Sequence, residues 1–107
     1  MNTLRAELNI NVAGEELPCI LSMNAFRILT QDHGIKLDAI DKFIEDDPMT
    51  GLAALAHAGC KNAAALKGKK LPINFEQFAA IILDDMDSLN GISEAFTAAM
   101  GGEPGNV

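Results

Sequence analysis

The sequence is poor in aromatic side chains and in cations. It has no tryptophan and no tyrosine, and phenylalanine accounts for only five residues. Aromatic side chains are the ones most used to stack on bases and to anchor broad binding faces. Only 8 lysines and arginines stand against 15 acidic residues, which gives a formal net charge of -7. Such a charge repels phosphate backbones and anionic membrane surfaces, so we expect neither nucleic acid nor a membrane as a direct partner.

Cysteines and long apolar runs are also scarce. Cys19 and Cys60 are the only cysteines, they lie far apart, and they belong to no Cys-X-X-Cys or Cys/His framework. We therefore expect two reduced core thiols and no disulfide or structural zinc site. No apolar run approaches the roughly 18 residues that a membrane-spanning helix needs. Arg5 lies where a secretory apolar stretch would begin, so we expect a cytoplasmic protein.

The length and composition are those of one compact domain. The chain has 107 residues, of which 49% are apolar and 21% charged, enough to bury a substantial aliphatic core. We expect a single globular domain over residues 1–101. Residues 102–107 have the composition of a flexible C-terminal tail.

Hydropathy alternates with a period of two near the N-terminus. Apolar side chains recur at Ala6, Leu8, Ile10 and Val12, and again at every second position in 17–21. The Gly14 segment between them supplies a turn, so the pattern predicts a β-hairpin. Two strands alone are marginal in water, and helices should therefore cover the apolar face.

After residue 22 the period changes to that of amphipathic helices. The pattern predicts helices over about 22–33, 37–45, 48–58, 74–86 and 89–100, with Gly59 ending the third and a break near Asp87 and Ser88 separating the last two. Asn74 and Gln77 have the spacing of a capping box, which predicts a sharp start to the fourth helix. The expected fold is α+β, with an N-terminal β-hairpin packed on a bundle of four to five helices.

No arrangement of side chains predicts catalysis, a metal site or a cofactor. The acidic segment 84–91 resembles a calcium loop, but no register places glycine sixth and glutamate twelfth. His57 and Cys60 are three positions apart on one helix, without a third group at a useful spacing. His33 is explained by its favourable position at a helix C-terminus. We predict that neither the cysteines nor the histidines are catalytic.

Two groups of residues are candidates for binding a partner. The first is a cluster of lysines, Lys61, Lys67, Lys69 and Lys70, which holds half of the positive charge of the chain. It is either a solvated short helix and loop or a contact for an acidic partner or a second acidic subunit. The second is the apolar stripe of the last helix, which comprises Met86, Leu89, Ile92, Phe96 and Met100. We expect this helix to be the least securely docked element and therefore available to a client, so that truncation at residue 87 should weaken binding more than folding.

Three segments resemble the tail assembly chaperones of long-tailed bacteriophages. They are the sequence from Ile10 to Pro18 followed by the helix 22–33, the segment from Asp47 to Gly59, and the Phe75–Phe78 segment, so that the resemblance spans residues 6–87. It implies a small acidic protein of the host cytoplasm, not expected in the mature virion, that binds the tape measure protein during tail assembly. Tail tube subunits are a second candidate client. It also implies self-association and a longer frameshifted form in many relatives, with no catalytic residues to carry over.

Two other classes of function stay open. One is a small acidic regulatory domain of bacterial or phage origin that binds another protein through its last helix. The other is a small hydrolase that uses His57 or Cys60. The many apolar helical stripes for so short a chain independently predict a homo-oligomer.

Overall fold

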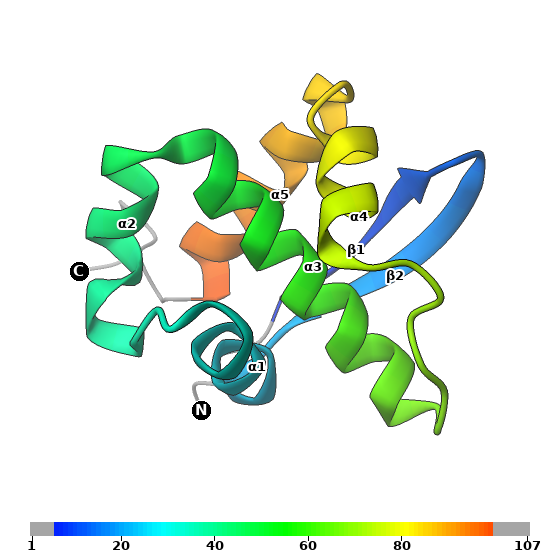
Figure 1. Cartoon of the computed structure of the whole chain (residues 1–107), viewed down its shortest axis with the longest axis horizontal. Helices are drawn as coiled ribbons and strands as arrows, with labels where there is room; N and C mark the ends of the chain where they lie inside the picture. The colour runs from blue at the N-terminus through cyan, green and yellow to red at the C-terminus, as the bar shows by residue number, and fades with distance from the viewer. Residues whose placement is uncertain (1–5, 100–107) are drawn as a thin grey trace.

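A computed structural model describes residues 6–99. Two strands, β1 (Ala6–Val12) and β2 (Glu15–Leu21), precede α1 (Met23–His33), a 3₁₀ turn η1 (Leu37–Ala39), α2 (Ile40–Asp46), α3 (Pro48–Leu66), α4 (Phe75–Ile82) and α5 (Met86–Ala99). A two-stranded antiparallel hairpin thus packs against five α-helices, which confirms the expected α+β class (Figure 1). The expected C-terminal tail, residues 102–107, lies outside the described residues.

The hairpin follows the alternation in the sequence. Ala13 and Gly14 connect the strands with positive φ angles of 55° and 83°, the combination that a type I′ turn requires. The Asn11 side chain accepts a hydrogen bond of 3.1 Å from the Gly14 amide. Pro18 lies opposite Asn9 in a sheet of two edge strands, where its missing N–H is tolerated.

Two helices cover the apolar face of the hairpin. Helix α3 packs on β2 and α5 packs on β1, while α1, α2 and α4 contact α3 (Figure 1). The core is correspondingly aliphatic, with a single edge-to-face ring pair between Phe26 and Phe96 among the described phenylalanines, at 6.3 Å between centroids. None of the described helices is both long enough and apolar enough to cross a bilayer.

The expected end of the third helix at Gly59 is wrong, because α3 continues to Leu66. Gly59 is instead the point where α3 lies against β2. A Cβ atom there would overlap the Cys19 Sγ atom and approach the Leu21 Cδ2 atom to 2.9 Å. The glycine is thus needed for close packing inside the helix, and residues 61–66 belong to α3.

Gly68 is the glycine that follows the end of α3. It has a φ of 71°, and its N–H donates to the Ala65 carbonyl at 2.9 Å while the Lys69 N–H donates to the Ala64 carbonyl at 2.9 Å. These two bonds form a Schellman motif, which fixes the direction of the chain as it leaves the helix.

The start of α4 is confirmed and the start of α5 is corrected. Asn74 and Gln77 form the full capping box, with the Gln77 N–H donating to the Asn74 side chain at 2.8 Å. The expected break near Asp87 and Ser88 lies earlier, at residues 83–85. Asp85 is the reason, since its carboxylate accepts from both the N–H and the hydroxyl of Ser88, at 3.2 and 2.9 Å.

Candidate functional site

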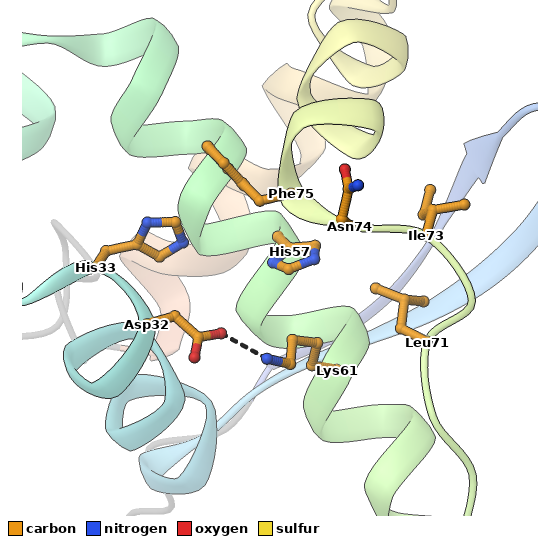
Figure 2. Close-up of a pocket in the computed structure, with 8 residues that line it drawn as sticks. All are labelled: Asp32, His33, His57, Lys61, Leu71, Ile73, Asn74 and Phe75. Atoms are coloured by element: carbon orange, nitrogen blue, oxygen red, sulfur yellow. Dashed lines mark hydrogen bonds and ion pairs between the residues drawn. The ribbon is translucent and has the colours of Figure 1, made fainter.

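Two cavities that share residues flank the C-terminal half of α3. The first, here called the histidine cavity, has a volume of about 530 Å³ and lies between α1, α3 and the segment that enters α4 (Figure 2). The second, here called the basic groove, has a volume of about 410 Å³ and lies between α1, α3 and the residues after α3. Asp32, Lys61 and Leu71 line both.

The histidine cavity is built around Phe75, the first residue of α4. The His33 ring at the end of α1 and the His57 ring on α3 both pack on Phe75 edge to face, with centroids 4.6 and 5.5 Å away (Figure 2). His57 also packs on Phe78, at 5.2 Å. The two imidazoles therefore join three helices through ring contacts.

Burial keeps both imidazoles uncharged near neutral pH. It lowers the pKa of His33 and of His57. The Lys61 ammonium lowers the pKa of His57 further, whereas at His33 the adjacent Asp32 carboxylate opposes the shift. The Nε2 atom of His33 and the Nδ1 atom of His57 are enclosed and have no hydrogen-bond partner among the described residues. His33 lies in the last turn of α1, as the sequence predicts, and its ring also packs on Phe75. Enclosed nitrogens are poorly placed to exchange protons with a substrate.

An ion pair forms the wall between the cavities. The Lys61 ammonium on α3 donates to the Asp32 carboxylate on α1 at 2.6 Å (Figure 2). Both side chains are about a third exposed, 38% and 30% respectively, so solvent screens the pair. The pair joins α1 to α3 at this point.

His57 and Cys60 do not form a functional pair. His57 faces α4, whereas Cys60 neighbours Cys19 on β2, whose thiol donates to the Ala56 carbonyl at 3.7 Å. Both thiols are free and buried, as expected. Interaction with the neighbouring Cys60 thiol raises the pKa of the Cys19 thiol, and burial raises it further. Cys19 is therefore a protonated, unreactive packing residue.

The basic groove brings together three of the four predicted lysines. Lys61, Lys69 and Lys70 line it, and Lys67 lines a smaller neighbouring pocket of about 190 Å³ with Lys69 and Lys70. Arg27 on α1 completes the groove. Sequence reasoning missed Arg27 because it lies in another helix, and no spacing links it to the lysines.

A buried asparagine supports this region and was also missed. Asn62 is 1% exposed. Its Nδ2 atom donates to the Ile20 carbonyl and the Ser22 hydroxyl, each at 3.0 Å, and its Oδ1 atom accepts from Asn24 at 2.7 Å. These bonds tie α3 to the junction of β2 and α1. In the sequence, the only sign of this role is that Asn62 is a polar residue next to a run of alanines.

The structure places most of the predicted apolar partner residues in the core. Ile92 is fully buried, and Leu89 and Phe96 are each 8% exposed. Met86 alone among the described members is exposed, and Met100 lies outside the described residues. Truncation at residue 87, which we expect to weaken binding more than folding, would also remove three core side chains, so α5 is more securely docked than the sequence predicts.

The chain was compared with protein-family models, with curated proteins and with solved structures. No family model, no curated protein and no solved structure matches it. The function therefore has to be argued from the residues themselves and from the resemblance given above.

Proposed function

We propose that this chain is a non-enzymatic binding protein that holds a client polypeptide, in the specific form of a phage tail assembly chaperone whose client is the tape measure protein. The observation that carries the proposal is the exposure of its methionines. Met23, Met49 and Met86 are 50%, 67% and 64% exposed, and each stands in the first turn of a helix. Leu37 and Leu66 are further exposed apolar residues.

Exposed methionines suit a protein that must adapt to a long helical client. The side chain is unbranched and polarizable, so it fills irregular gaps on different partners at small conformational cost. The excess of acidic side chains opposes precipitation while apolar surface is exposed. The enclosed Nδ1 atom of His57 and the burial of Cys60, which is 2% exposed, favour this class over a hydrolase.

The choice of client rests on the resemblance to tail assembly chaperones. The segments that carry it, the hairpin followed by α1, the first part of α3 and the start of α4, are all regular elements of the fold. The tape measure protein is the first client to test and the tail tube subunit the second. Self-association through the exposed apolar side chains is part of the same proposal.

Coexpression tests the proposal directly. The full chain is coexpressed with the tape measure protein encoded near it, and the soluble fraction of that protein is measured. We expect the chain to keep the tape measure protein soluble, and a triple Met23→Ser, Met49→Ser, Met86→Ser variant to lose this activity. The matched control is the Met→Leu triple variant, which keeps apolar surface at the same positions and should retain the activity.

Thermal unfolding of each variant separates loss of binding from loss of folding. All three substitutions are at exposed positions, so each should change stability by no more than about 0.5 kcal/mol. A tape measure protein that stays insoluble beside a folded wild-type chain would overturn the proposal. So would a folded serine variant that holds the client as well as the wild type does.

A further inference from the structure

The basic groove concentrates positive charge on an otherwise acidic molecule. Four of the eight lysines and arginines line it, Arg27, Lys61, Lys69 and Lys70, together with one carboxylate, that of Asp32. The chain as a whole has a net charge of -7. A local reversal of sign in a concave surface raises the local concentration of oppositely charged groups and steers them to the site.

Most of this charge is not neutralised within the described part of the chain. Lys61 is paired with Asp32. Arg27 donates from Nε to the Asn24 amide oxygen at 2.9 Å and from Nη1 to that of Gln31 at 3.0 Å, and both acceptors are uncharged. Lys69 and Lys70 have no carboxylate partner among the described residues. Among the described residues, three cations therefore have no carboxylate partner and can pair with a ligand.

The groove is also held in shape and has an apolar floor. The two hydrogen bonds around Gly68 fix the backbone that carries Lys69, and the packing of α1 on α3 sets the two helices that form the walls. Ile28, Ala65 and Leu71 are the apolar residues of its lining, here called its floor. A ligand that fits must supply carboxylates at the rim and an aliphatic group for the floor.

We propose that the basic groove binds an acidic segment of a partner protein, in which aspartate or glutamate side chains flank an aliphatic residue. The carboxylates pair with Arg27, Lys69 and Lys70, and the aliphatic side chain packs on the floor. A nucleic acid fits less well, because no aromatic side chain lines the groove to stack on a base and the rest of the molecule repels phosphates.

This inference gives the proposed binding function a place and a chemistry, and it rests on that function only for the identity of the partner. Its test therefore uses a synthetic peptide. The probe is a short fluorescein-labelled peptide in which glutamates flank leucines, with the matching glutamine peptide as its neutral counterpart. Binding to the full chain is measured by fluorescence anisotropy at low and moderate salt.

We expect the acidic peptide to bind and the glutamine peptide to bind at least about tenfold more weakly, with affinity falling as salt rises. Lys69→Glu combined with Lys70→Glu should weaken binding of the acidic peptide by about tenfold or more, because two attractive contacts become repulsive. The matched control is Lys36→Glu with Lys42→Glu, which changes the net charge equally outside the groove. It should leave affinity within about twofold.

Three results would overturn the inference. They are equal affinity for both peptides, equal losses in the groove variant and the control, and tighter binding of a labelled single-stranded oligonucleotide than of the acidic peptide. The coexpression assay separates this failure from failure of the proposed function. Equal affinity for the acidic and the glutamine peptide, with the tape measure protein still held by the wild type, would refute the groove and leave the function standing. Binding of the acidic peptide by a chain that does not keep the tape measure protein soluble would refute the proposed function and leave the groove standing.

Discussion

Gly59 shows how one residue can fix the contact between a helix and a sheet. Because its missing Cβ lets α3 lie against Cys19 and Leu21, we expect Gly59→Ala to lower the free energy of unfolding by about 1–3 kcal/mol, the usual cost of overpacking. Gly91→Ala is the matched control within α5. Its added methyl would meet only the end of the Leu8 side chain, at 3.3 Å.

Urea unfolding of both variants measures the difference. Gly91→Ala increases helix propensity, which stabilises the fold by up to about 1 kcal/mol. The flexible Leu8 side chain can move to relieve its close contact with the new methyl group. This control should therefore be close to the wild type in stability. Equal stability of the two alanine variants would show that α3 does not depend on Gly59 for its approach to β2.

The two histidines make stability depend on pH. Burial lowers the pKa of both in the folded state below the ordinary value of 6.5, so between the folded and unfolded pKa values the unfolded chain binds more protons. Their contribution to stability is therefore fully present above about pH 6.5 and is lost as the pH falls through their folded pKa values. Urea unfolding at several pH values between about 7.5 and 5 measures this loss.

A double variant isolates the histidine contribution from that of other groups. His33→Gln with His57→Gln removes both titrations while keeping polar side chains of similar size. We expect this variant to be less stable at pH 7.5 but to lose less stability than the wild type as the pH is lowered. Identical pH dependence in the two proteins would contradict the histidine account.

At the scale of elements, α5 is part of the core as well as a surface. Ile92 and Met86 lie on the same helix, yet Ile92 is fully buried and Met86 is 64% exposed. We expect Ile92→Ala to cost about 2–5 kcal/mol of unfolding free energy and Met86→Ala no more than about 0.5 kcal/mol. Urea unfolding checks both values. A small cost for Ile92→Ala would mean that α5 is loosely docked and could leave the hairpin to meet a client.

The sequence predicts the ends of a helix or strand only where the residues that determine them are close together in the chain. The hairpin follows from the alternation of hydropathy, the start of α4 from Asn74 with Gln77, and the end of α1 from Gly34. In each case the determinants lie within a few residues of the element. The predicted end of α3 is wrong because a glycine in a helical sequence can either end the helix or allow close packing inside it. Gly59 admits a neighbouring strand and Gly68 ends the helix, and only the tertiary contact with Cys19 distinguishes them.

At the scale of the whole molecule, a surface forms from segments that no sequence pattern connects. The lysine cluster was visible as a run, but its meeting with Arg27 depends on how α1 packs on α3. The same packing brings His33, His57 and Phe75 together. The apolar stripe of α5 is different, because its period does predict a helix. The period does not show whether the apolar face packs in the core or binds a partner.

We propose that this chain holds a client through defined parts of its surface. Hydrogen–deuterium exchange of the full chain, alone and with saturating tape measure protein, tests it most directly. We expect slower exchange on binding in the first turns of α1, α3 and α5 and in residues 67–71, with the hairpin turn at Ala13 and Gly14 unchanged. Unchanged exchange throughout, or protection confined to that turn, would contradict the account.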